Sequence, residues 1–378
     1  MPDPRHTVLV AGGSVGAFGR FPDRSLCDLS QPVLSAALRN AGIEARDVQA
    51  GFVGNAFGGT LQHQESILGQ ILLNPVGIAG IPIHTVKNAC SSGSDAVHLA
   101  WSAVAHGQID CALVLGAEKL THEDRRATFA ALATATDREA AAEGRSVFMD
   151  VNAERARRYM AAHGATARHF AMCAAKNRAH AALNERAAVR EPIDVETVLA
   201  DKPVVGPLTR SMCGGIADGA AAVILVSESH ARKRGLSGPR LIASAVASGL
   251  PGGEGASATA RAGALAFEQA GLGPDDVTIA EVHDPTSPQE FFDIEELGLA
   301  APGGAIALVE AGETSIGGRL PVNTSGGLTC RGHPVGATGV AQIVELAEQL
   351  TGRAGLRQVD GAKVGIAQMA GGLLGNDS

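Results

Sequence analysis

Aromatic side chains are scarce in this chain of 378 residues, which has one tryptophan, one tyrosine and ten phenylalanines. Glycine, by contrast, occupies 48 positions. Hydrophobic residues make up 45% and charged residues 19%, close to the averages of globular proteins, so wholesale disorder is excluded. The length predicts two or three domains with a large core and excludes a single small binding module.

Positive charge is also in short supply. The sequence has 31 lysines and arginines against 39 acidic residues, a net charge of −8. This is the wrong sign for a protein whose main task is to neutralise a phosphate backbone. We therefore expect no nucleic-acid partner.

Long hydrophobic runs are missing. The longest purely aliphatic stretch is Ala220–Val226, whereas a membrane helix needs roughly 18 apolar residues. The segment Met1–Gly13 has neither a basic leader nor a long apolar core. We expect no membrane span and a cytoplasmic location.

Closely spaced cysteine pairs are absent as well. The six cysteines stand at positions 27, 90, 111, 173, 213 and 330, without a C-x-x-C pair. This spacing argues against a zinc knuckle or a disulfide framework, and no metal is expected.

Short β-branched runs alternate with longer helical patterns along the chain. Strands are predicted at Thr7–Ala11, Cys111–Leu115, Ala221–Val226, Leu241–Val246 and Lys363–Gln368, and helices near 31–41, 94–105, 153–162, 167–182, 257–270 and 338–350. The alternation predicts an α/β protein whose sheets are covered on both faces by helices.

An internal repeat divides the chain into two similar halves. Ala41–Ile43, followed by Asp47 and Val48, recurs 229 residues later as Ala270–Leu272, followed by Asp276 and Val277. A second pair links Cys90–Gly93 to His333–Gly336, each followed by a helix of small residues. Because both pairs occur in the same order, we interpret the chain as a duplication.

The segment 119–208 between the halves carries more basic than acidic residues, whereas the rest of the chain is acidic. Either its helices are simply charged and solvated, or the segment binds a phosphorylated ligand.

Cys90 is the candidate nucleophile. It lies in the small-residue loop Val86–Ser94, directly before the predicted helix 94–105. A helix N-terminus lowers the pKa of a thiol, and the thiolate is the nucleophilic form. The alternative role of a small buried hydrophobic residue fits Cys27, Cys111 and Cys173 better, because these lie in apolar periodic stretches.

His333 is the candidate base. It lies in the glycine-rich segment Ser325–Gly339, and Pro334 suits the first turn of the following helix. If the repeat is structural, His333 occupies in the second half the place of Cys90 in the first. The two would then form a Cys/His pair that can deprotonate a thiol and return the proton.

These segments resemble those of thiolases of the sterol-carrier-protein type. Asn88–Ser94 resembles the family's nucleophile loop, His283–Thr286 its His-Asp-Cys-Phe element and Gly332–Gly339 its Gly-His-Pro motif. Further similarity covers Asp218–Val223, Arg157–Met160 and Lys176–Asn184, so that the resemblance runs from about Val8 to Gly372.

The resemblance implies a five-layered α-β-α-β-α fold of two duplicated halves with an inserted loop domain. Residues 1–118 and 209–236 would form the N-terminal half, 119–208 the loop domain that covers coenzyme A, and 237–378 the C-terminal half. It also implies a homodimer or a dimer of dimers, and a place in lipid metabolism.

The resemblance further implies a role for each site residue. Cys90 would take the acyl group of acyl-CoA as a thioester, activated by His333, while His283 would help bind the thioester oxygen. Gly371 and the Cys90 backbone N–H would form a second oxyanion hole. Coenzyme A enters as part of the substrate, and no covalently bound cofactor is expected.

One departure from the family pattern concerns the second acid/base, usually a cysteine. Its two family positions hold Pro285 and Met369, neither of which titrates. Cys330, three residues before His333, is a possible replacement. The sequence therefore supports acyl-enzyme formation more strongly than it supports the making or breaking of a carbon–carbon bond.

Several functions remain open beside an acyl-CoA acyltransferase. They are a 3-ketoacyl-CoA thiolase, a retro-aldolase acting on a CoA thioester, and a non-catalytic subunit with a small OB-fold (DUF35-like) partner. Nicotinamide binding is disfavoured, because the glycines of Val8–Gly19 lack the G-x-G-x-x-G spacing and are followed by Arg20–Asp23 instead of an amphipathic helix.

Overall fold

The structure is a computed structural model that describes residues 6–136, 147–250, 255–372 and 376–377. The helices are α1 (Leu26–Ala41), α2 (Gly58–Gln62), α3 (Leu68–Leu73), α4 (Ser92–Ala105), α5 (Arg125–Leu132), α6 (Val147–His163), α7 (Ala167–Ala182), α8 (Val195–Ala200), α9 (Glu228–Arg234), α10 (Ala258–Ala270), α11 (Ser287–Glu296), α12 (Gly304–Glu310), α13 (Gly327–Cys330) and α14 (Val335–Leu350). The strands are β1 (Val8–Val15), β2 (Ala50–Gly54), β3 (Ile83–Val86), β4 (Cys111–Glu118), β5 (Pro203–Val205), β6 (Leu208–Thr209), β7 (Gly219–Ser227), β8 (Arg240–Leu241), β9 (Ala247–Ser248), β10 (Ile279–Glu281), β11 (Gly365–Ala367) and β12 (Asn376–Asp377).

The larger sheet has the strand order β3-β2-β4-β7-β1-β8. Strand β2 runs parallel to β3 and β4, whereas β7 lies antiparallel between β4 and β1. Every residue of β4 and β7 is buried. Strands covered on both faces are continuous apolar runs, which is why the sequence pattern identified these two.

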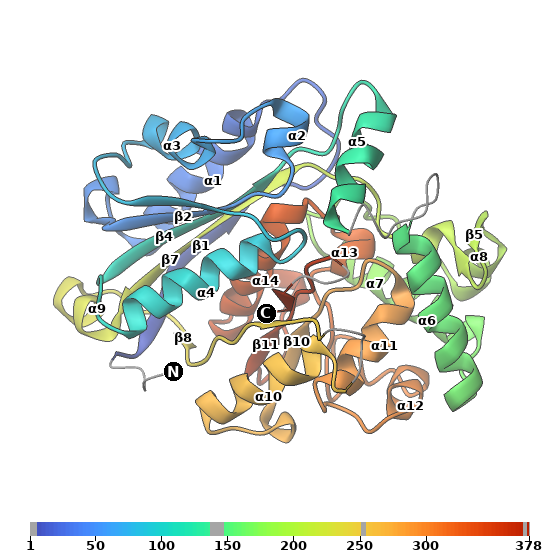
Figure 1. Ribbon diagram of the computed structural model, residues 1–378. Helices are drawn as coiled ribbons and strands as arrows, with labels where there is room; N and C mark the ends of the chain where they lie inside the picture. The colour runs from blue at the N-terminus through green and yellow to red at the C-terminus, as the bar shows by residue number, and fades with distance from the viewer. Residues whose placement is uncertain (1–5, 137–146, 251–254, 373–375, 378) are drawn as a thin grey trace.

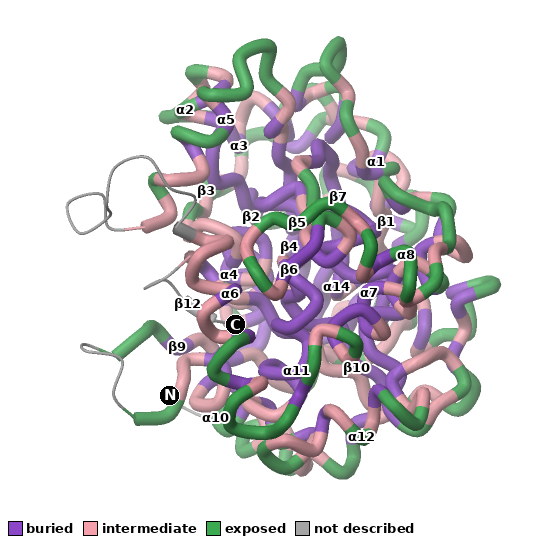
Figure 2. The backbone as a smooth tube through the Cα atoms, turned by 90° about the vertical axis from the view of Figure 1, so that its right-hand side faces the viewer, coloured by how far each residue is buried: buried purple, intermediate pink, exposed green. Residues whose placement is uncertain are grey.

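Five layers are stacked through the molecule (Figure 1). Helix α1 covers one face of the large sheet, and α4 and α14 cover the other. The small parallel sheet β10–β11 packs on the far side of α14, where Ile279 meets Leu346. The next residue, Ala280, faces the outer helices, including α7 and α11. The expected five-layered fold is confirmed, and Figure 2 shows the buried backbone running through its centre.

The repeat detected in the sequence has the same local structure in both halves. Helix α1 ends at Gly42, with φ 69°, and α10 ends at Gly271, with φ 63°, the left-handed geometry that favours glycine as a helix C-cap. Each cap is followed by a short 3₁₀ turn, Ala45–Asp47 or Pro274–Asp276, and then by a strand, β2 or β10.

The predicted strand Leu241–Val246 is wrong in its central part. Of its residues only Leu241 pairs, as part of β8 with β1, and the pairing of β9 with β12 begins one residue beyond the predicted end. A strand needs a neighbour to satisfy its backbone, and no described strand lies beside residues 242–246.

The glycine-rich segment near the start is part of a strand, not a phosphate-binding turn. Gly12 and Gly13 lie inside β1. A Cβ at Gly12 would stand 2.4 Å from the Ala41 nitrogen, so glycine is needed there to let α1 approach the sheet.

Among the described residues, no helix has both the length and the apolar character needed to cross a bilayer. The expected domain boundaries stay a prediction.

Candidate active site

Cys90 stands on a tight loop immediately before α4. Ala89 has φ 44°, a left-handed conformation that costs a non-glycine residue energy and persists only where surrounding contacts fix it. Those contacts include the Asn88 N–H, which donates to Ser92 Oγ (2.8 Å), and the Asn88 side chain, which donates to Asp95 Oδ2 (2.7 Å). The loop thus holds Cys90 at the N-terminal end of α4.

His333 stands in the same position relative to α14. Its backbone forms a bridge with Ile216, and α14 begins two residues later at Val335. Helices α4 and α14 cross at glycines: a Cβ on Gly93 would lie 2.5 Å from the Gly336 carbonyl oxygen. This close approach brings the two helix N-termini, and with them Cys90 and His333, together.

His283 follows β10 and completes the group. Its backbone N–H donates to Gln368 Oε1 (3.0 Å), which ties it to the segment after β11. Its ring lies edge-on to the His333 ring, with centroids 5.4 Å apart. One side-chain atom each from Cys90, His283 and His333 lies within 4.8 Å of the other two.

The tautomer of His333 follows from its hydrogen bonds. The Thr338 hydroxyl donates to the Pro334 carbonyl (3.0 Å), so it can only accept from His333 Nδ1 (2.8 Å). The ring proton is therefore on Nδ1, and Nε2 carries the lone pair. The Nε2 atoms of His333 and His283 are buried without a hydrogen-bond partner among the described residues.

The pKa of Cys90 is raised to about 12, mainly by burial and further by the nearby Glu118 carboxylate. The backbone amides of Gly372 and of Cys90 itself act in the opposite direction. The pKa therefore moves opposite to the expected lowering, because loss of hydration outweighs the hydrogen bonds from these two amides.

Burial likewise favours the neutral form of both histidines. The pKa of His283 is lowered to about 3, by burial and then by the Arg155 charge. The pKa of His333 lies well below its ordinary value, through burial, His283 and Arg331. The resting group is one thiol beside two neutral imidazoles, of which His333 can act as a base.

Glu118 is a residue that the sequence analysis missed. Its fully buried carboxylate accepts hydrogen bonds from the backbone N–H groups of Ala56 (2.9 Å), Phe57 (3.1 Å) and Gly336 (3.1 Å). It thereby joins β4 to the first turn of α14. Burial raises its pKa to about 7, against these hydrogen bonds. In the sequence, Glu118 could have been recognised as a carboxylate at the end of an otherwise apolar strand.

The amide that contacts the Cys90 sulfur is that of Gly372, the neighbour of the expected Gly371. An oxyanion hole that includes Gly371 stays a prediction.

Cys330 is not part of the convergent group. Its side chain is buried between Ala181 and Ala187 of the inserted segment, and burial raises its pKa to about 12. Met369 is fully buried, and the Pro285 carbonyl accepts from the Gly214 N–H (2.8 Å). These contacts offer no replacement acid/base beside Cys90.

The basic segment 119–208 uses part of its charge in ion pairs. Arg155 pairs with Glu296 (3.0 Å), and Lys176 is buried against Glu290. Asn177 donates to the buried Asp284 (2.8 Å), next to His283 in sequence. Helix α7 is thus attached directly to the element that carries His283.

Comparison with known proteins gives a consistent picture. The family descriptions "Thiolase, N-terminal domain" and "Thiolase C-terminal domain-like" match residues 8–202 and 254–378. An acetyl-CoA acetyltransferase of Methanothermobacter thermautotrophicus is 38% identical over 374 residues, which cover 97% of each chain. The benzoylsuccinyl-CoA thiolase subunit BbsB of Thauera aromatica is 35% identical and covers 97% of this chain and 94% of its own. Human sterol carrier protein 2 is 32% identical over 98% of this chain and 71% of its own length.

Solved structures agree on the fold. The Ltp2-ChsH2(DUF35) aldolase superposes with a TM-score of 0.81 at 25% identity, over 98% of this chain and 97% of that one. Human mitochondrial 3-ketoacyl-CoA thiolase in complex with CoA gives a TM-score of 0.76 at 19% identity, over 98% and 96% of the two chains. Since both thiolase domains are matched and relatives above 30% identity align along nearly the whole length, the chain belongs to the thiolase family.

Proposed function

We propose that this member of the thiolase family is an acyltransferase that takes the acyl group of acyl-CoA as a thioester on Cys90. The observation that carries the proposal is the convergence of Cys90, His333 and His283 from three separate elements within 4.8 Å. In it a nucleophile stands beside a base that a third group, Thr338, orients.

The acylation step follows from this arrangement. As the Cys90 sulfur attacks the thioester carbonyl carbon, its proton passes to Nε2 of His333. The carbonyl oxygen becomes an oxyanion, which the Cys90 and Gly371 or Gly372 amides stabilise, together with His283. The intermediate then expels the CoA sulfur, which takes the proton from His333, and acyl-Cys90 remains.

The acceptor of the acyl group is less constrained. By the family resemblance, Pro285 and Met369 fill the two positions of the proton-transferring cysteine, so an acceptor that is already nucleophilic is favoured over a carbon acid. The 3-ketoacyl-CoA thiolase activity is the close alternative within the family. A retro-aldolase acting on a CoA thioester is a second candidate, supported by the aldolase among the similar structures.

The test of the proposal is mass spectrometry of the intact chain after incubation with acetyl-CoA and longer acyl-CoAs. We expect a single acyl adduct that is lost in Cys90→Ala and forms more slowly in His333→Ala. Cys27→Ala, which removes another half-buried cysteine, is the matched control and should label normally. An adduct that persists in Cys90→Ala would overturn the assignment, and absence of any adduct would favour the aldolase.

A second experiment measures acetoacetyl-CoA cleavage against acylation. Without the acid/base, cleavage should be slower than acylation by about 10²–10⁴-fold, the usual contribution of such a group. Pro285→Cys should raise the cleavage rate. Efficient cleavage by the unmodified chain that is abolished by Cys330→Ala would instead identify an ordinary thiolase.

We further propose a homodimer or dimer of dimers in the cytoplasm, and a small OB-fold partner. The similarity to the Ltp2-ChsH2(DUF35) aldolase, whose name includes a DUF35 component, supports the partner. Analytical ultracentrifugation of the purified chain, with and without such a protein, tests both the oligomeric state and the partner.

A further inference from the structure

A buried ion pair joins the two segments that carry the site histidines. Arg331 Nη1 stands 3.4 Å from Glu281 Oε2, and the two side chains are 2% and 1% exposed. Glu281 is the last residue of β10 and precedes His283 by two positions. Arg331 directly follows α13 and precedes His333 by two positions. The ion pair is therefore a direct connection between the backbone segments of the two histidines.

The Glu281 carboxylate is also held by the turn before α13. Its Oε1 accepts from the Ser325 N–H (2.9 Å) and the Thr324 hydroxyl (3.3 Å), and its Oε2 accepts from the Ser325 hydroxyl (2.5 Å). Arg331 Nη1 donates to the same hydroxyl (3.1 Å). Since Glu281 has these neutral donors besides Arg331, its carboxyl group keeps partners when the arginine is replaced.

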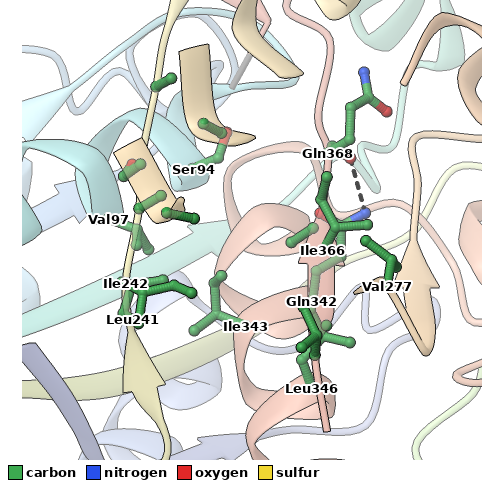
Figure 3. A pocket seen from close by; sticks show the side chains of 18 of the residues that line it. Ser94, Val97, Leu241, Ile242, Val277, Gln342, Ile343, Leu346, Ile366 and Gln368 are labelled. Carbon is green, nitrogen blue, oxygen red and sulfur yellow. Dashed lines mark hydrogen bonds between the residues drawn. The ribbon is translucent and has the colours of Figure 1, made fainter. Parts of the chain in front are cut away.

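A second connection between the same segments runs through Gln368. Its backbone N–H donates to the Glu281 carbonyl (2.9 Å), and its Oε1 accepts from the His283 N–H (3.0 Å). Its own carbonyl accepts from Gln342 Nε2 of α14 (3.1 Å), the hydrogen bond drawn in Figure 3. Because α14 begins two residues after His333, this connection and the ion pair both fix His333 relative to His283.

The Arg331 ion pair is poorly arranged for stability. Arg331 Nε and Nη2 are buried without a hydrogen-bond partner among the described residues, although a guanidinium offers several donors. Two buried charges lose their hydration, and one contact at 3.4 Å offsets this loss only in part. By contrast, Arg357 donates to both carboxylate oxygens of Glu345, at 2.9 to 3.2 Å. Stability alone therefore does not account for the cation at position 331.

The Arg331 charge also acts on His333. Burial, His283 and Arg331 together hold the pKa of His333 well below its ordinary value. A nearby cation disfavours the imidazolium form, so Nε2 of His333 keeps its lone pair. The other charged or titratable groups at the site are Cys90 before α4, Glu118 at the end of β4, His283 after β10 and Arg155 of α6.

We propose that Arg331 and Glu281 are positioning residues for acylation: their ion pair fixes the separation of His283 and His333, and the Arg331 charge favours the unprotonated His333 that accepts the Cys90 proton. The inference rests on the proposed function, in which His333 is the base. Once His333 is protonated, the same charge makes it a stronger acid, which helps it to return the proton to the departing CoA sulfur.

The first test follows protonation of the His333 ring by NMR, on the purified chain with ¹³C-labelled histidine and without an acyl donor. His333→Gln identifies the signal. Arg331→Met removes the charge and should move the midpoint of the His333 titration to higher pH, by about one pH unit. Arg331→Lys keeps the charge and should restore the original midpoint. Equal midpoints in Arg331→Met and the unmodified chain, or no protonation of His333 in either, overturn the proposal.

Glu281→Gln separates the connection from the charge. The amide keeps the shape and can still accept from Ser325, but it no longer forms an ion pair with Arg331. The His333 midpoint should therefore not rise, whereas acylation of Cys90 should slow by roughly tenfold or more, the effect of one lost charged hydrogen bond. Acylation at the original rate would show that the ion pair does not position the histidines.

Arg357→Met is the matched control, because it also removes a buried arginine from an ion pair, here with Glu345 (2.9 Å). It should lower the melting temperature without moving the His333 midpoint. Equal movement in Arg331→Met and Arg357→Met would indicate a general loss of packing and contradict the assignment. Circular dichroism checks that each variant folds.

Two further provisions keep the outcomes distinct. If Arg331→Met does not fold, the double variant Arg331→Met/Glu281→Gln takes its place in the titration, since it leaves neither charge of the pair buried alone. The titration uses no acyl donor. A raised midpoint without any acyl-Cys90 would therefore refute the acyltransferase and support the charge effect, whereas normal acylation with an unmoved midpoint would refute only the role of Arg331.

Discussion

Cys90, His283 and His333 are neutral in the resting site, and this predicts how acylation depends on pH. The thiol, with a pKa of about 12, keeps its proton throughout the neutral range, and His283, with a pKa of about 3, stays unprotonated. The pKa of His333 is also depressed, so the base is already free below neutral pH. The rate of Cys90 acylation, followed by quenched-flow mass spectrometry, should therefore be nearly flat between about pH 6 and pH 9. A sigmoidal rise near pH 8 would mean that a thiolate forms before attack.

In the proposed mechanism Thr338 is a positioning residue, since its hydroxyl contacts His333 Nδ1. Thr338→Val keeps the shape but leaves the buried Nδ1–H without an acceptor. We expect acylation to slow by roughly 10- to 100-fold, the effect of one unpaired buried donor. The conservative Thr338→Ser should restore most of the rate. A merely structural role would lower the melting temperature of both variants without this difference in rate.

The sequence identified Cys90, His333 and His283 as candidate site residues. Each of them lies in a short motif that can be recognised without the structure. The direction of the Cys90 pKa shift could not be predicted, because it depends on burial and on Glu118, which is distant in sequence. The contact of the Gly372 amide with the sulfur is likewise a matter of loop geometry. Neither the composition nor the spacing of residues in the sequence shows how far a side chain is shielded from water.

Among the elements, the crossing of α4 and α14 determines the site. A Cβ on Gly339 would stand 2.6 Å from the Ser94 backbone nitrogen and 3.0 Å from the Ser94 Cα atom of α4. Gly339→Ala should therefore destabilise the fold by about 1–3 kcal/mol, although alanine favours helices. Gly273→Ala is the control, because the nearest atom there is a carboxylate oxygen 3.9 Å away. Urea unfolding measures both, and equal stability would contradict a backbone-limited crossing.

Long helices and strands, in which the pattern of apolar residues extends over many positions, were predictable from the sequence. Helices α4, α7, α10 and α14 and the strands β4 and β7 all lie within three residues of their expected bounds. In the second half, β11 lies inside the predicted strand Lys363–Gln368, whereas β10 was missed, because its three residues are too few to show alternation. The segment 241–246 has a strand sequence but lacks a described strand as neighbour.

At the scale of the whole molecule, charge is distributed unevenly. The basic segment 119–208 retains exposed cations beyond its ion pairs, such as Arg125, Arg190 and Lys202. If they meet the phosphates of coenzyme A, affinity for CoA should exceed that for dephospho-CoA and decrease with salt, as exposed pairs are screened. Isothermal titration calorimetry at low and high salt measures this. Equal affinities at low salt would show that the segment is only solvated.

Because the candidate site takes its residues from both halves of the chain, it can form only after most of the chain has been synthesised. His333 follows Cys90 by 243 positions. A ribosome adding about 5–20 residues per second needs roughly 12–50 s to cover that distance. Throughout this time the nascent chain carries the proposed nucleophile without the proposed base, and the rest of the second half is still missing. On the proposed mechanism, reactivity should therefore appear late in synthesis, and an interrupted chain that includes Cys90 but not His333 should release a thiol that acyl-CoA leaves largely unmodified.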